Sequence, residues 1–135
     1  MSKGMHNLIP LLLVVVFLAM IGSIIRPRKG SGRPNPNITA AKIDIADINS
    51  ALNIFQRDCG RYPTTEEGLA ALVKRPPAIP PAQWRGRYLQ IVAVDPWGRP
   101  YVYERPGFHN TNAYDVYSLG PNGKGGNEAI GNWTP

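Results

Sequence analysis

The feature that most constrains this chain is an uninterrupted apolar run near its start. Residues 8–25, LIPLLLVVVFLAMIGSII, carry no charged side chain. As an α-helix they would be about 27 Å long, close to the hydrocarbon thickness of a bilayer, roughly 30 Å. Pro10 falls in the first turn, where its missing N–H costs no helical hydrogen bond. We therefore expect a single transmembrane helix over residues 8–25, after a short N-terminal segment, residues 1–7.

A cleaved secretory signal is the alternative interpretation of the same run. The uncharged stretch is longer than the apolar core of a usual signal peptide, and no clean small-x-small cleavage site follows it. Retention of the segment as a membrane anchor is therefore favoured.

The net charge of +6 sits almost entirely at the N-terminal end of the chain. Residues 1–37 carry five basic side chains and no acidic one, whereas residues 38–135 carry ten basic and nine acidic ones. A DNA-binding domain gathers Lys and Arg on the face that meets phosphates. Here the excess flanks the apolar run, so the charge indicates a membrane partner and no nucleic acid.

The residues that follow the apolar run are typical of a linker. Residues 26–37, RPRKGSGRPNPN, hold three prolines and two glycines among polar side chains, with neither helical nor strand periodicity. The basic residues of such a linker can lie against anionic lipid headgroups. The remaining residues, 38–135, are enough for one globular domain.

That domain begins with a predicted amphipathic helix. Its apolar stripe recurs at steps of three and four residues: Ile45, Ile48, Leu52 and Phe55. We expect Asn37 or Thr39 to cap this helix and Gly60 to end it. A capping-box spacing from Thr64 to Glu67 predicts a second, shorter helix before the two prolines at 76–77.

Three runs rich in β-branched and aromatic residues then predict strands, at 88–94, 101–104 and 114–119. The sequence DPWG at 95–98 is typical of a type I turn between the first two. A sheet packed on the long helix would bury both apolar faces. The fold class is therefore predicted as α+β: a long helix on a small three-stranded antiparallel sheet. The tail, residues 120–135, is predicted as a Gly/Asn-rich loop that Ile130 and Trp133 close.

Catalytic constellations are absent from the sequence pattern. His6 precedes the apolar run, His109 falls in a predicted loop, and no motif couples either with Cys59. Cys59 is the single cysteine, so it cannot form an intramolecular disulfide, and we expect a small buried side chain. The chain is predicted not to be an enzyme and to take no small-molecule substrate.

Four motifs occur in a fixed order: RDCGRYPTTEEGL at 57–69, DPWGRPY at 95–101, YDVYSLG at 114–120 and IGNW at 130–133. Together they resemble the major pseudopilins of the type II secretion system, over residues 39–135. The resemblance implies a pilin-like fold and a subunit or accessory of a short periplasmic filament, the pseudopilus, that supports protein secretion. It also implies that the partners are like subunits or other secretion-system proteins, together with the inner membrane.

The N-terminus resembles the family's prepilin peptidase signal in a degenerate form. In KGMHNLIPLL at 3–12, cleavage would fall between Gly4 and Met5. The family then carries a Glu at the fifth mature position, whereas this chain has Ile9 there, followed by Pro10. That difference and the flexible linker leave an alternative function open: a stand-alone membrane-tethered protein-binding module that kept the fold without filament assembly.

The resemblance also implies a calcium loop, whose acidic residues are largely replaced here. The positions that match family acids are Asn122, Asn127 and Ala129, which leaves Glu128 as the one carboxylate of the loop. Because calcium sites rely on carboxylates, we expect no cofactor and weak calcium binding at most.

Two arguments about membrane orientation disagree. The basic linker outweighs Lys3 and the amino terminus, which favours a cytoplasmic domain by the positive-inside rule. The family places its domain in the periplasm. We follow the resemblance, which implies a single-pass protein of the bacterial inner membrane with a periplasmic domain.

Overall fold

The structure, a computed structural model, describes residues 33–133. The expected N-terminal segment, the transmembrane helix over residues 8–25 and most of the linker lie outside the described residues. Among the helices of residues 33–133, none combines the length and hydropathy that crossing a membrane requires.

The long helix is confirmed as α2, Pro36–Cys59. It begins two residues earlier than the expected start of the domain at residue 38, and the predicted N-caps, Asn37 and Thr39, are wrong. Asn35 is the N-cap, and its side-chain oxygen accepts a hydrogen bond from the N–H of Asn37 at 3.0 Å. Pro36 follows at the first helical position, where its fixed φ favours helix initiation. The helix ends as expected at Gly60, whose φ of 76° is left-handed.

The expected second helix is only a 3-10 turn, η1, Leu69–Leu72. The capping box does form: the Thr64 hydroxyl accepts the N–H of Glu67 at 3.2 Å, and Glu67 Oε2 accepts the N–H of Thr64 at 2.9 Å. Gly68 follows with φ 58° and ψ −163°, which is far from helical geometry. An α-helix therefore cannot continue through Gly68, and the capping box is followed only by the short 3-10 turn.

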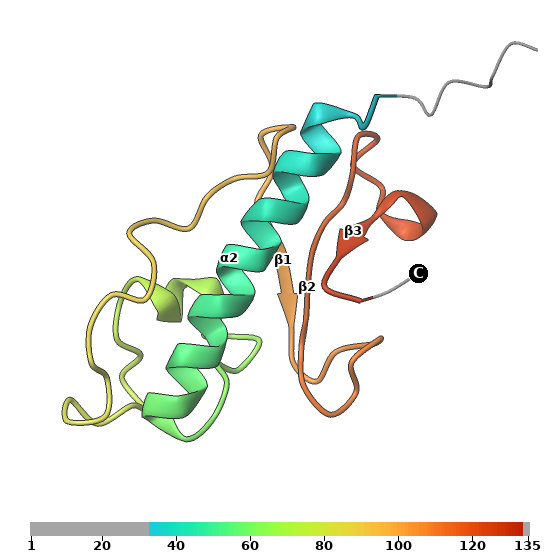
Figure 1. Cartoon of the computed structure of the whole chain (residues 1–135). Coiled ribbons are helices and arrows are strands. Elements are labelled where there is room, and N and C mark those ends of the chain that lie inside the picture. Colours follow the sequence, from blue (N-terminus) through green and yellow to red (C-terminus); the bar gives the residue numbers. More distant parts are fainter. Residues whose placement is uncertain (1–32, 134–135) are drawn as a thin grey trace, which may run out of the picture. The chain divides into compact units, whose positions relative to one another are not determined.

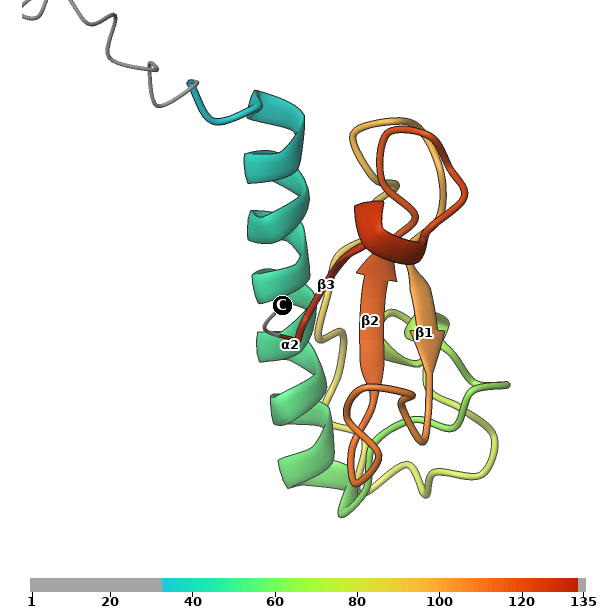
Figure 2. The same cartoon turned by 90° about the vertical axis from the view of Figure 1, so that its right-hand side faces the viewer.

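The sheet has three antiparallel strands in the order β1, β2, β3, as Figure 2 shows. They are β1 (Val102–Glu104), β2 (Asp115–Ser118) and β3 (Ile130–Gly131). Tyr103 lies opposite Val116, and Ser118 lies opposite Ile130. The class of sheet is confirmed, but its third strand comes from the tail, where the sequence predicted only a loop.

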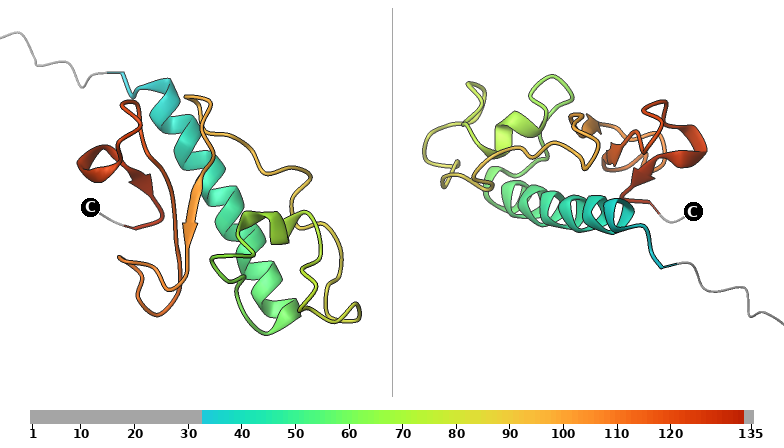
Figure 3. Two further views of the ribbon diagram at one scale, coloured as in Figure 1. Left: turned by 180° about the vertical axis from the view of Figure 1, so that it is seen from behind. Right: turned by 90° about the horizontal axis from the view of Figure 1, so that it is seen from above.

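The predicted strand at 88–94 is wrong. Its first two N–H groups, those of Tyr88 and Leu89, donate to the carbonyl of Leu72, so the segment is held by η1 and not by the sheet. Farther along, Ile91 is 73% exposed. Only an isolated bridge joins Val94 to the chain after the turn. The segment is part of the golden-yellow loop that rises alongside α2 in Figure 1 and is seen from behind in the left view of Figure 3.

The core lies between α2 and one face of the sheet (Figures 1 and 2). The predicted helix stripe is buried in full, with Leu52 and Phe55 at 0% exposure. Two tyrosine hydroxyls also fasten the helix to the sheet side. Tyr101 donates to Asp44 at 2.7 Å, and Tyr114 donates to Asn49 at 3.1 Å. Apolar burial with satisfied hydroxyls is what lets tyrosine serve as a core residue.

Candidate functional site

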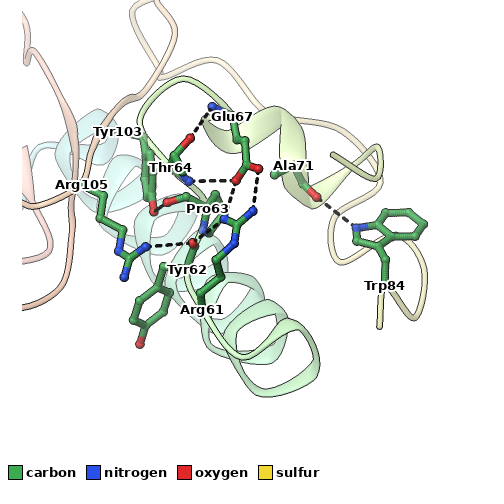
Figure 4. Close-up of polar contacts among 9 residues, drawn as sticks. All are labelled: Arg61, Tyr62, Pro63, Thr64, Glu67, Ala71, Trp84, Tyr103 and Arg105. Carbon is green, nitrogen blue, oxygen red and sulfur yellow. Dashed lines mark hydrogen bonds and ion pairs between the residues drawn. The ribbon is translucent and has the colours of Figure 1, made fainter. Parts of the chain in front are cut away.

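The side chains of the four sequence motifs form hydrogen bonds between elements that are distant in the chain. We call each such group of hydrogen bonds a joint. The first joint, shown in Figure 4, centres on Glu67. Its two carboxylate oxygens accept hydrogen bonds from the two terminal nitrogens of Arg61, both at 2.7 Å. Arg61 lowers the pKa of Glu67, although burial opposes that shift. Because the same carboxylate closes the Thr64 capping box, one side chain fixes the whole turn.

Hydrogen bonds also connect this turn, at residues 61–67, to the end of strand β1. The hydroxyl of Tyr103 donates to the carbonyl of Pro63 at 2.8 Å, and Arg105 donates to the carbonyl of Tyr62 at 3.1 Å (Figure 4). On the other side of η1, the indole N–H of Trp84 donates to the carbonyl of Ala71 at 3.3 Å. The first motif therefore connects the C-terminal end of α2 to β1 through hydrogen bonds.

The second joint is the predicted turn at 95–98, which is confirmed by the hydrogen bond from the N–H of Gly98 to the carbonyl of Asp95 at 2.8 Å. The Asp95 side chain is 2% exposed. It accepts hydrogen bonds from the N–H groups of Trp97 and Arg99 and, at 2.6 Å, from the hydroxyl of Ser118. Burial raises the pKa of Asp95, but these donors together outweigh it, so the pKa lies below its usual value.

The third joint is built around Asp115, which is 1% exposed. It accepts two hydrogen bonds from His109, from the backbone N–H at 2.8 Å and from the ring Nδ1 at 3.0 Å. It also accepts the backbone N–H and the side-chain amide of Asn110, at 3.0 and 2.8 Å. Burial raises the pKa of Asp115, but these hydrogen bonds outweigh it and leave the pKa lowered.

The fourth motif joins β3 to that network. The side-chain oxygen of Asn132 accepts the N–H of Val116, and its amide donates to the carbonyl of Tyr114, both at 3.1 Å. Next to it, the ring of Trp133 stacks on His109, with centroids 3.8 Å apart and planes within 7°. The predicted role of Trp133 in closing the tail is confirmed by this packing.

The loop at 120–128, which contains the 3-10 turn η2 (Gly126–Glu128), does not fit a calcium ion. Arg99 donates from Nη1 to the carbonyl of Gly120 at 2.8 Å and from Nη2 to that of Pro121 at 3.4 Å. The side-chain oxygen of Asn122 accepts the N–H of Lys124 at 2.8 Å. Across residues 33–133, no three His, Cys, Asp or Glu side chains gather as metal ligands.

The candidate reactive residues do not come together. Cys59 is 8% exposed, and its sulfur lies 3.9 Å from the Tyr88 hydroxyl. Burial raises the pKa of the Cys59 thiol, in accord with the buried side chain that the sequence predicted. His109 faces Asp115 and Trp133 instead. The possible peptidase site, Gly4 and Met5, lies outside the described residues.

The described surface carries a groove and several exposed apolar side chains. A groove of about 500 Å³ runs between the start of α2 and β3, with Ile38 on one side and Trp133 on the other. Phe108, in the loop between β1 and β2, is 83% exposed. Ile43 on the outer side of α2 is 57% exposed. Single exposed apolar side chains are common on protein surfaces, so these residues do not by themselves mark an interface.

Comparison with known proteins gives a consistent result. The profile of the family described as type II secretion system (T2SS), protein G, matches residues 32–133. The type II secretion system core protein G of Pseudomonas aeruginosa is 42% identical over 133 residues, covering 94% of this chain and 92% of the relative. That of Klebsiella pneumoniae is 36% identical over 131 residues, covering 95% and 92%.

A solved structure agrees with the sequence relatives. It is the major pseudopilin from the type 2 secretion system of enterohaemorrhagic Escherichia coli, with a TM-score of 0.66 and 33% identity. The match covers 81% of this chain and 92% of that one. On sequence and fold together, this chain belongs to the protein G family of the type II secretion system, the major pseudopilins.

Proposed function

We propose that the chain is a structural subunit of the pseudopilus, anchored in the inner membrane with its domain in the periplasm, and that it works by contacts with like subunits and other secretion-system proteins. The observation that carries this proposal is the family match across residues 32–133. The motifs support it, because each serves to hold the domain together. Like subunits form an open helical filament when one surface of the molecule contacts a different surface of the next copy.

A secretion assay tests the proposed function. In the bacterium that encodes this chain, we expect deletion of the gene to leave type II substrates in the periplasm. The amounts in culture medium and periplasm are compared by quantitative mass spectrometry, and the wild-type gene should restore secretion. A matched variant that lacks residues 8–25 should fail to restore it. An unchanged exoproteome in the deletion strain would contradict the proposal and favour the tethered binding module.

Processing of the N-terminus provides a separate test. We propose that a prepilin peptidase cuts after Gly4, because KGM at 3–5 precedes the apolar run as in the family signal. The expected mature protein then begins at Met5, and mass spectrometry of the chain isolated from membranes measures this directly. Replacement of Gly4 by valine should leave the precursor uncut. A native chain that still carries its first four residues would contradict the cleavage.

A further inference from the structure

We propose that the guanidinium group of Arg99 acts as a built-in cation that holds the loop at 120–128, so that this loop keeps its shape without a calcium ion. The family resemblance implies calcium at this loop, and the residues present do not fit it. What the structure places there is a permanently charged side chain from a turn that lies 21 residues away in sequence.

The first support is the pairing of the loop's oxygens. A hard cation is bound by carbonyl and carboxylate oxygens that are free to point at it. Here the carbonyl of Gly120 accepts Nη1 of Arg99 at 2.8 Å, and that of Pro121 accepts Nη2 at 3.4 Å. The carbonyl of Leu119 accepts the N–H of Gly125 at 3.0 Å. These three carbonyl oxygens are therefore already paired with donors within the chain.

The second support is the way in which Arg99 itself is held. Its backbone N–H donates to the buried carboxylate of Asp95 at 2.8 Å. The same carboxylate accepts the hydroxyl of Ser118, and that hydroxyl accepts the N–H of Gly120 at 3.0 Å. Asp95 therefore holds the backbone of Arg99 directly and the backbone of Gly120 through the Ser118 hydroxyl. A positioned donor loses less conformational entropy on binding than a free surface arginine would.

The third support is the close approach of the loop to the guanidinium plane. A Cβ atom added at Gly123 would lie 2.7 Å from Cζ of Arg99 and 2.8 Å from its Nε. Gly126, three residues later, also has positive φ, but a Cβ there would meet nothing within 4 Å. The loop backbone therefore lies directly against the Arg99 guanidinium at Gly123, whereas at Gly126 it faces open space.

The first test uses the full chain in detergent. We expect the melting temperature of the wild type to be the same, within about 1 °C, in EGTA, CaCl₂ and MgCl₂, since a ligand raises it only by binding the folded state. Arg99→Met should lower it by on the order of 5 °C. It should also speed tryptic cleavage after Lys124 about tenfold, as the loop opens more often. Arg57→Met is the matched control, because Arg57 is exposed and should leave both readouts unchanged.

The second test is a double-mutant cycle, which remains informative if single variants are unstable. Gly123→Ala should lower the melting temperature more in the wild type than in Arg99→Met, because the methyl group clashes with the guanidinium. Gly126→Ala should have equal effects in both backgrounds. Equal effects of Gly123→Ala in both backgrounds would overturn the proposal. So would a rise of several degrees in the wild type with CaCl₂ that MgCl₂ does not reproduce.

Discussion

Replacement of Phe55 by alanine is expected to lower the free energy of unfolding by about 4 kcal/mol. The Phe55 ring is 0% exposed and lies on the buried stripe of α2. It meets the ring of Tyr88 edge to face, with centroids 5.5 Å apart. Its removal therefore leaves a cavity where α2 meets the loop that η1 holds, and it also removes a favourable aromatic contact.

Chemical denaturation of the compact unit at residues 34–135 measures this loss. Ile54→Ala is the matched control. Ile54 precedes Phe55 on the same helix, but it is 40% exposed, so its truncation should cost about 1 kcal/mol or less. If both variants lost the same stability, the ring of Phe55 would not be packed as the structure shows.

The helix was predictable because periodicity is a local signal. Ile45, Ile48 and Leu52 are spaced for one face of a helix, and that face is buried. Its start was not, since Asn35 and Asn37 are both good caps and only the geometry distinguishes them. Helix ends depend on single residues, so an error of two positions is in keeping with the local chemistry.

The sheet was predictable in kind but not in membership. β3 has two residues, Ile130 and Gly131, and two residues show no alternation. The segment at 88–94 has the composition of a strand, but its first two backbone N–H groups donate to the carbonyl of Leu72 and not to a neighbouring strand. That choice is made by a contact between distant segments, which no pattern within the segment records.

In the candidate site, too, local features were predictable from the sequence and contacts between distant segments were not. The capping box of Thr64 and Glu67 was predictable from its spacing, although the bidentate partner Arg61 was missed. A basic residue six positions before Glu67 and next to a turn was the available signal. Arg99 gave no such signal, because it occupies a turn and its partners lie 21 and 22 residues away. Long-range hydrogen bonds of this kind require the fold to be known.

Substitution of Asp115 by alanine is expected to lower the free energy of unfolding by about 3 kcal/mol or more, because each buried donor left without an acceptor costs about 1–3 kcal/mol. The carboxylate is 1% exposed and accepts four hydrogen bonds, two from His109 and two from Asn110. Truncation leaves two backbone N–H groups without their acceptor and opens a gap beneath the loop between β1 and β2. Asp115→Asn keeps the volume but exchanges one acceptor oxygen for a donor, so it should lose less than the alanine variant does.

The same carboxylate should make stability depend on pH. Because the pKa of Asp115 is lowered in the folded state, the unfolded chain takes up the proton more readily in acid. Its contribution is therefore complete above the usual pKa of about 3.9 and is lost as the pH falls through the lower folded value. The wild type should lose stability steeply below about pH 4, and Asp115→Asn should lose less over that range. Asp95, whose pKa is also lowered, stays in the variant and keeps part of the slope. Denaturation midpoints between pH 7 and pH 2 measure the difference, and parallel curves would show that Asp115 is not held as an ionised acceptor.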